Sequence, residues 1–106
     1  MTSIKPYPVT PQRSVPEHIA RPAYVGRTRP EPYRGPHVQT AETIEKMRLA
    51  GRIAARAMRA GADAIAPGVT TDAIDAVVHE YLLDHDAYPS TLGYRCFPKS
   101  CCTSVN

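Results

Sequence analysis

Proline is distributed very unevenly along this chain, and its distribution limits where regular structure can form. Eight of the eleven prolines fall within residues 1–36 of the 106-residue sequence. Proline lacks a backbone N–H donor and drives the preceding residue toward extended geometry. Residues 1–36 are therefore expected to form a disordered extension of coil and polyproline II. A packed core must come from residues 37–106, which suffice for one small domain.

Charge divides at the same boundary. Residues 1–36 hold six Lys and Arg against two acids, whereas residues 37–106 hold seven against eight. The net charge of +3 therefore belongs to the extension, and the near-neutral remainder argues against specific DNA binding by the core. No apolar run has the length that a membrane span needs. Three cysteines crowded near residue 100 make a poor disulfide framework, which predicts free thiols and a cytoplasmic location.

The extension contains a proline spacing that is found in peptide ligands. The stretch KPYPVTPQR has Pro8 and Pro11 at PxxP spacing, with Lys5 before them and Arg13 after them. Polyproline II segments of this kind bind the aromatic grooves of SH3-type domains. A solvated linker or surface-hugging arm is the favoured interpretation, and an SH3-type contact through residues 5–34 is the alternative.

A first helix is predicted over residues 41–61. Thr40 can cap its N-terminus. Apolar side chains at alternating spacings of three and four form one stripe, which comprises Ile44, Met47, Gly51, Ala54 and Met58. The arginines that occupy mostly the other side are interpreted as a solvated face, because nearby acids dilute their charge.

A second helix is predicted from residue 71 to about residue 86, with Thr70 or Thr71 as its cap. Its apolar stripe follows the helical period and comprises Ile74, Val77, Val78, Tyr81 and Leu82. His79 flanks this stripe. It has no second His or Cys at ligand spacing, so it is interpreted as a surface histidine.

The helical period stops at Tyr88. Pro89, Gly93 and Pro98 exclude a long helix, and the β-branched and aromatic residues between them predict a short strand followed by a turn. A thiol-metal module built from the three cysteines, Cys96, Cys101 and Cys102, with one histidine is disfavoured. The C-x4-C-C spacing lacks the C-x2-C turn that presents two sulfurs to zinc.

Four sequence blocks occur in a fixed order: IEKMRLAGRIAARA, PGVTTDAID, HEYL and YPSTLGY…FPKSCCTSVN. Together they resemble the start of the type I methionine aminopeptidases, in the metal-dependent creatinase/aminopeptidase ("pita-bread") family. The resemblance covers about residues 37–106, and the Pro-rich lead resembles the N-terminal extension of actinobacterial and some eukaryotic members. It implies an α+β fold, of which this chain supplies two N-terminal helices and the first strand and turn of the sheet.

The resemblance implies an enzyme that removes the initiator methionine from nascent polypeptide N-termini. Two divalent ions (cobalt, manganese, iron or zinc) would hold the attacking water. The family's metal ligands lie further along than this chain reaches, so the chain is expected to be a truncated fragment that holds no catalytic residue and is inactive alone. A non-enzymatic relative acting as a binding module is the alternative. Because such enzymes act on emerging chains, residues 5–34 are also expected to contact the ribosome.

The resemblance also implies a methionine pocket lined by Tyr94, Phe97 and Cys102, with Thr91 beside it. Aromatic edges and a soft sulfur suit a flexible, polarizable thioether. Ordinary core packing of the two aromatics is the alternative. Asn106 matches a family position that helps to hold a monovalent cation.

One residue departs from the family pattern, because Cys96 stands where the family usually has glycine. A β-carbon there is predicted to strain or shift the pocket turn if φ is positive. The two apolar stripes would normally close on sheet strands, so this length of chain is expected to have only a marginal core.

Overall fold

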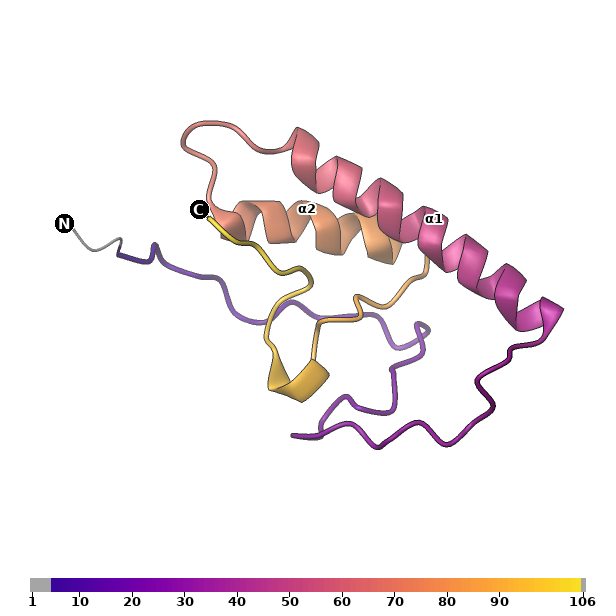
Figure 1. The fold of residues 1–106 in the computed structure, drawn as a ribbon. Coiled ribbons are helices and arrows are strands. Elements are labelled where there is room, and N and C mark those ends of the chain that lie inside the picture. The colour runs from indigo at the N-terminus through magenta and orange to yellow at the C-terminus, as the bar shows by residue number, and fades with distance from the viewer. Residues whose placement is uncertain (1–4, 106) are drawn as a thin grey trace.

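The computed structural model describes residues 5–105 and contains two helices and one short 3-10 turn (Figure 1). The elements are α1 (Ala41–Asp63), α2 (Thr71–Asp84) and η1 (Tyr94–Cys96). The helices lie side by side and antiparallel, and the irregular lead passes along the side of α2 that faces away from α1. No strand forms within residues 5–105, so the strand expected after Tyr88 is not observed there. A single strand has no ladder partner in this part of the chain, and turns replace it.

Both helices begin where the sequence predicts, because a threonine caps each of them. The Oγ1 atom of Thr40 accepts a hydrogen bond from the amide of Thr43 at 3.2 Å. The Oγ1 atom of Thr70 accepts one from the amide of Ala73 at 3.1 Å. Each bond satisfies one of the backbone donors that the first helical turn leaves free. Local chemistry thus sets both helix starts.

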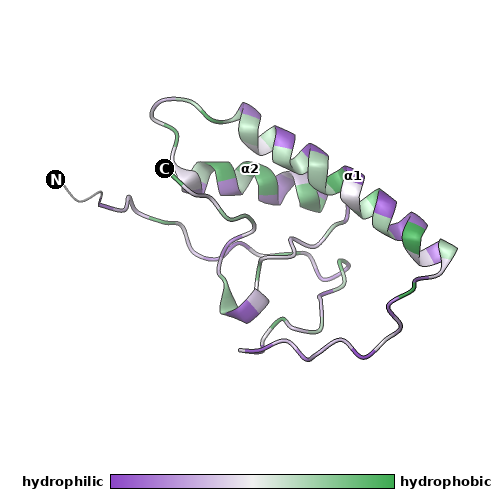
Figure 2. Cartoon of the chain, viewed as in Figure 1, coloured by the Kyte–Doolittle hydropathy of each residue, from purple (hydrophilic) through white to green (hydrophobic). Residues whose placement is uncertain are grey.

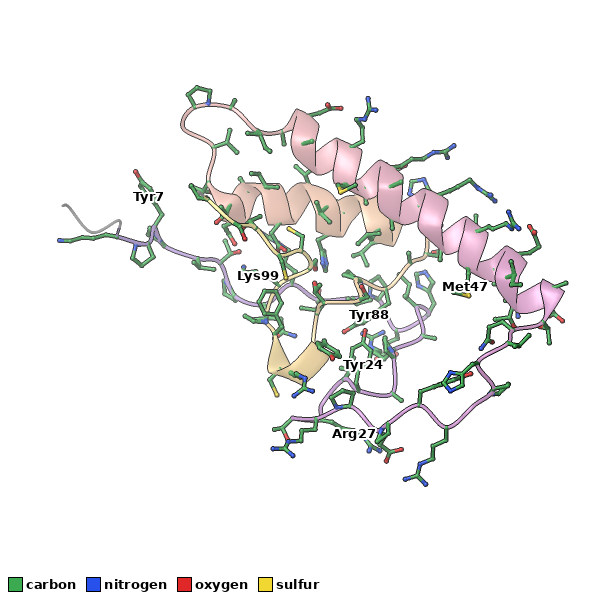
Figure 3. All side chains as sticks on the ribbon, viewed as in Figure 1. Tyr7, Tyr24, Arg27, Met47, Tyr88 and Lys99 are labelled. Atoms are coloured by element: carbon green, nitrogen blue, oxygen red, sulfur yellow. The ribbon has the colours of Figure 1, made fainter. Side chains whose placement is uncertain are left out.

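The helices pack through small residues near the end of α1. Ala57 and Gly61 are the buried residues of α1, and Val78 of α2 is 8% exposed. A β-carbon on Gly61 would lie only 2.9 Å from the Cγ2 atom of Val78, so glycine permits this close approach. Much of the predicted α1 stripe is solvent-exposed, including Met47 (Figure 3) and Met58 at 61% and 72%. This exposure agrees with the expectation of an uncovered stripe.

A second apolar cluster joins the N-terminal lead to the segment after α2. Val15, Ile19 and Leu92 are 8%, 3% and 2% exposed, and Leu83 and Tyr88 pack against them. The lead forms no helix or strand between residues 5 and 36, as its prolines predict. Val15 and Ile19 of the lead pack against the segment after α2, as a surface-hugging arm would. Burial of two apolar side chains offsets part of the entropy that ordering this segment costs.

Polar and apolar residues alternate along both helices, and hydrophilic residues dominate much of the irregular chain (Figure 2). Among residues 5–105, neither helix combines the length and the hydropathy that crossing a bilayer requires.

Candidate functional site

An apolar groove of about 600 Å³ opens between α1, α2 and the segment that follows α2. The α1 wall is built largely from small residues, among them Ala54, Ala57 and Gly61. Ile74 and Val78 contribute from α2. Because small side chains line one wall, the groove has room for an unbranched apolar group.

Two of the four predicted pocket residues line this groove, namely Thr91 and Cys102. The Oγ1 atom of Thr91 donates a hydrogen bond to the carbonyl of Lys99 at 2.9 Å. This bond joins the segment that carries Thr91 to the segment that carries Lys99 and Cys102. Asn106, the predicted monovalent-cation residue, lies outside the described residues.

The two predicted aromatic residues lie at η1, away from the groove lining. Tyr94 is 42% exposed and packs edge-on against Tyr24, with ring centroids 5.2 Å apart. Tyr24 in turn donates a hydrogen bond to the carbonyl of Ser90, and it lies close to Tyr88 in Figure 3. Phe97 is 36% exposed. Neither Tyr94 nor Phe97 is therefore an ordinary core residue among residues 5–105.

The backbone at Cys96 meets the condition on which the predicted strain depended. Its φ is +64°, and that of the preceding Arg95 is +49°. The left-handed region penalises residues that carry a β-carbon. The sequence prediction of a strained turn at Cys96 thus agrees with the positive φ found there.

A buried carboxylate organises the chain beside the groove. Asp75 is 3% exposed and lies on α2. Its Oδ1 atom accepts the backbone amides of Ser100 at 2.7 Å and Cys101 at 3.1 Å. Its Oδ2 atom accepts the Nε–H of Arg13 at 3.2 Å. Three donors from two distant segments therefore satisfy one buried charge.

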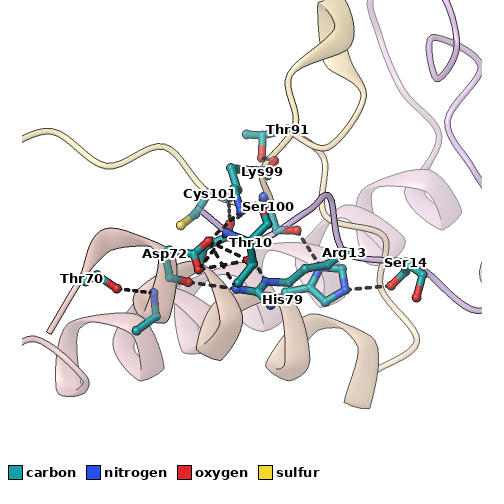
Figure 4. Close-up of polar contacts among 12 residues, drawn as sticks. Thr10, Arg13, Ser14, Thr70, Asp72, His79, Thr91, Lys99, Ser100 and Cys101 are labelled. Carbon is teal, nitrogen blue, oxygen red and sulfur yellow. Dashed lines mark hydrogen bonds and ion pairs between the residues drawn. The ribbon is translucent and has the colours of Figure 1, made fainter. Parts of the chain in front are cut away.

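His79 is buried, which corrects its interpretation as a surface histidine. It is 2% exposed, its Nε2 lies 2.9 Å from the carbonyl oxygen of Ser14, and its Nδ1 lies 2.7 Å from the Oγ atom of Ser100 (Figure 4). A carbonyl can only accept, so Nε2–H donates to Ser14, and in the neutral imidazole Nδ1 accepts the Ser100 hydroxyl. The apolar stripe of α2 gave no indication of this burial, because His79 is covered by two irregular segments, which contain Ser14 and Ser100.

Asp72, in the first turn of α2, also holds partners from two other segments (Figure 4). The Nζ atom of Lys99 lies 2.7 Å from its Oδ1 atom, and the hydroxyl of Thr10 donates to the same carboxylate at 2.9 Å. The hydrogen bond from Lys99, assisted by those from Thr10, holds the pKa of Asp72 below its ordinary value. Lys99 and Thr10 therefore favour the charged form of this carboxylate.

The three cysteines differ in environment. Cys101 is half-buried, whereas Cys96 and Cys102 are exposed, and all three are free thiols. Burial, followed by the nearby Asp75 charge, raises the pKa of the Cys101 thiol to about 11. Cys101 is therefore protonated and weakly nucleophilic at neutral pH.

Residues 5–105 do not offer a site for the divalent ions that the sequence resemblance implies. No group of three or more His, Cys, Asp or Glu side chains within this part of the chain is arranged to hold a metal ion. Two of the four acids on α2, Asp72 and Asp75, are engaged by Lys99, Arg13 and backbone amides. The structure of residues 5–105 therefore does not fit the dinuclear centre on its own.

Comparison with known proteins identifies the protein family of this chain. The profile of metallopeptidase family M24 matches residues 45–106. The chain belongs to metallopeptidase family M24.

Several similar curated proteins are named methionine aminopeptidases. "Methionine aminopeptidase 2" of Mycobacterium tuberculosis is 58% identical over 105 residues, which cover 99% of this chain and 37% of that protein. "Methionine aminopeptidase 1D, chloroplastic/mitochondrial" of Arabidopsis thaliana is 46% identical over 104 residues, 97% of this chain and 30% of the relative. "Methionine aminopeptidase 1" of Schizosaccharomyces pombe is 44% identical over 111 residues, 98% of this chain and 29% of the relative. The chain thus spans about a third of the length of these relatives.

Proposed function

We propose that this chain forms the methionine-recognition part of a metal-dependent methionine aminopeptidase, which removes the initiator methionine from nascent proteins. One observation carries the proposal: 99% of the chain aligns with the Mycobacterium tuberculosis methionine aminopeptidase at 58% identity. Family membership sets the reaction class, since M24 proteins are metallopeptidases. The binding-module alternative has no comparable support among the relatives.

The groove supports this assignment chemically. A methionine side chain is unbranched, apolar and polarizable, and it fits a groove walled by alanines and glycine with a sulfur at its edge. Thr91 and Cys102 are the proposed groove contacts. Tyr94 in η1 and Phe97 directly after it are proposed to contact the substrate, since their partial exposure leaves ring surface available.

The two divalent ions of the proposed enzyme would polarise the scissile carbonyl and activate water. Because residues 5–105 offer no cluster of metal ligands, these residues are proposed to supply recognition, and the hydrolytic centre would need ligands from other residues. The whole M24 architecture, an α+β pita-bread fold, is proposed on family membership, with α1 and α2 as its first helices.

The ribosome is the proposed partner of the N-terminal lead, in the cytoplasm. Arg29 and Arg34 are exposed and carry no ion pair among the described contacts. Arg13, by contrast, is already engaged by Asp75, so an SH3-type contact that used Arg13 would have to displace it. Replacing Arg29 and Arg34 with glutamine should weaken ribosome co-sedimentation at low salt. Unchanged co-sedimentation would exclude this role.

A hybrid enzyme tests the proposed activity. In the hybrid, this chain replaces the matching 105 residues of the Mycobacterium tuberculosis methionine aminopeptidase. Release of free methionine from a peptide beginning Met-Ala, with cobalt or manganese added, is expected. A folded hybrid that releases none, beside an active parent enzyme, would overturn the proposal.

A variant of the hybrid then tests the groove. Cys102→Phe places a bulky ring at the groove edge and should raise KM for the peptide by about tenfold, a loss of ~1.4 kcal/mol in binding. Cys96→Ala is the matched control, because it also removes an exposed thiol but lies outside the groove. Equal KM values for the two variants would remove Cys102 from the substrate contacts.

A further inference from the structure

We propose that Arg13 and Asp75 are positioning residues, which tie the N-terminal lead to the bend at residues 99–101 and so hold Cys102 at the edge of the groove. The tie itself is a property of the structure alone. Its effect on substrate rests on the proposed function, and the two are tested separately below.

Asp75 is the centre of the tie. One carboxylate oxygen holds the amides of Ser100 and Cys101, and the other holds the guanidinium of Arg13. The side chain of Asp75 is only 4% exposed. A buried carboxylate is tolerated when charge and hydrogen bonds compensate it, and Arg13 is the cation that lies against Asp75 among the described residues. The bend and the lead therefore depend on each other through this one group.

The guanidinium group of Arg13 is held through two of its nitrogens. While its Nε–H donates to Asp75, its Nη2 donates to the backbone carbonyl of Asp72 at 3.1 Å. These two acceptors lie in the first turns of α2. A lysine has the same charge but cannot make both contacts in this geometry. The site thus selects an arginine, in a segment whose composition alone suggests a disordered linker.

Two further contacts connect the same three parts of the chain. The imidazole of His79, on α2, bridges the carbonyl of Ser14 in the lead and the hydroxyl of Ser100 in the bend. Lys99 of the bend donates to the carbonyl of Thr10 in the lead at 3.2 Å. Each residue of the bend is therefore held by α2 or by the lead (Figure 4).

The groove residue Cys102 directly follows this bend. The other groove residue from the pocket prediction, Thr91, donates to the carbonyl of Lys99 within the bend. Loosening the bend would therefore move both groove contacts. Arg13 and Asp75 do not line the groove, so their influence on substrate is through position and not through contact.

The first experiment measures the bend directly in the full 106-residue chain. Alkylation of Cys101 by iodoacetamide is followed by tandem mass spectrometry, with exposed Cys96 as the internal reference. Arg13→Gln should accelerate Cys101 alkylation about tenfold relative to Cys96, because the bend opens locally. Loss of a nearby cation would by itself raise the pKa of the Cys101 thiol and slow its alkylation. Faster alkylation therefore indicates that the bend opens, and not that the local charge has changed.

Arg27→Gln is the matched control, since Arg27 lies in the same lead but pairs with exposed Glu31. An unchanged or slower Cys101 ratio in Arg13→Gln would overturn the tie. So would an equal acceleration in Arg27→Gln. If Arg13→Gln loses its helical circular dichroism, Arg13→Lys is measured in its place, and its ratio is interpreted in the same way.

The second experiment uses the hybrid enzyme to test the effect on substrate. Arg13→Gln should raise KM for a Met-Ala peptide several-fold more than it lowers kcat, and should reduce the preference for Met-Ala over Leu-Ala. Arg13→Lys should recover part of that preference, whereas Arg27→Gln should match the unaltered hybrid. A hybrid that is inactive without any substitution refutes the proposed function and leaves the alkylation result standing. Opening of the bend with unchanged Met-over-Leu preference would refute the positioning role.

Discussion

The helical pair and the irregular segments around it are held together by different kinds of contact. Helices α1 and α2 meet through small apolar atoms, where Gly61 lies against Val78. The lead and the bend at residues 99–101 meet the other side of α2 through charge and hydrogen bonds, centred on Asp75. Helix α2 thus has one face that is packed sterically and one face that is paired electrostatically.

This difference follows from backbone hydrogen bonding. A helix satisfies its own amides and carbonyls, so only its side chains need partners. Irregular chain leaves amides such as those of Ser100 and Cys101 without ladder partners, and a buried carboxylate supplies acceptors for them. The polar face should therefore respond to loss of a charge, and the apolar face to a change of volume.

Loss of the carboxylate at Asp75 should give the largest effect. Asp75→Ala leaves the Nε–H of Arg13 and two backbone amides without their acceptor and should lower the free energy of unfolding by about 3–5 kcal/mol. Urea denaturation followed by circular dichroism measures it. Asp84→Ala, at an exposed position on the same helix, is the matched control and should change stability by no more than ~0.5 kcal/mol. Similar losses in both variants would contradict the electrostatic account of this face.

A methyl group at Gly61 should disturb the apolar face. The added carbon would meet Val78 at 2.9 Å, so Gly61→Ala should destabilise the chain by about 1–3 kcal/mol. Gly51→Ala is the control with the opposite expected sign. Its added carbon meets nothing within 4 Å, and alanine is preferred in a helix by ~1 kcal/mol. Thermal unfolding of both variants measures the contrast, and a stabilised Gly61→Ala would show that the helices do not approach this closely.

Glycine at position 96 should relieve strain in an irregular segment. Because φ at Cys96 is +64°, Cys96→Gly should raise the free energy of unfolding by about 1 kcal/mol and raise the melting temperature. Cys96→Ala removes the same thiol but keeps the β-carbon, so it should give no such gain. If both variants were equally stabilised, the thiol rather than the backbone would be responsible.

An effect confined to high pH is expected from the Cys101 thiol. Its pKa is raised from 9.0 to about 11 in the folded chain, so the stabilisation is present below pH 9 and is lost as the pH rises through 11. Melting temperatures of the parent and Cys101→Ala should therefore differ in pH dependence, with Cys101→Ala falling less between pH 8 and pH 11. Cys102→Ala, at an exposed thiol, is the control and should follow the parent. Parallel curves for Cys101→Ala and the parent would show that the Cys101 thiol is not linked to folding.

The parts of the structure that depend on neighbouring residues were predicted well. Thr40 and Thr70 begin the helices as expected, since a cap acts over three residues. Strain at Cys96 was predicted through the family resemblance on the condition that φ is positive, and φ there is +64°. The predicted groove contacts Thr91 and Cys102 lie together, although their role in binding methionine stays a prediction.

The parts that depend on distant residues were not predicted. His79 was expected at the surface, and Asp75 was not singled out at all. One signal was available, because Asp72, Asp75 and His79 recur at i, i+3 and i+7 along one side of the second helix. From the sequence alone, such a stripe is interpreted as a solvated face, because its partners lie in distant segments: the lead and the bend at residues 99–101.

The amino-acid sequence by itself determined the two helices, their threonine caps, the family to which the chain belongs and the irregular course of the Pro-rich lead, because these depend on local stereochemistry or on ordered motifs. Only the tertiary structure decided that the lead packs against the segment after α2, that Asp75 and His79 are buried, and that residues 99–101 are held beside the groove. Burial and charge pairing depend on which segments meet in space, and no local pattern specifies that meeting.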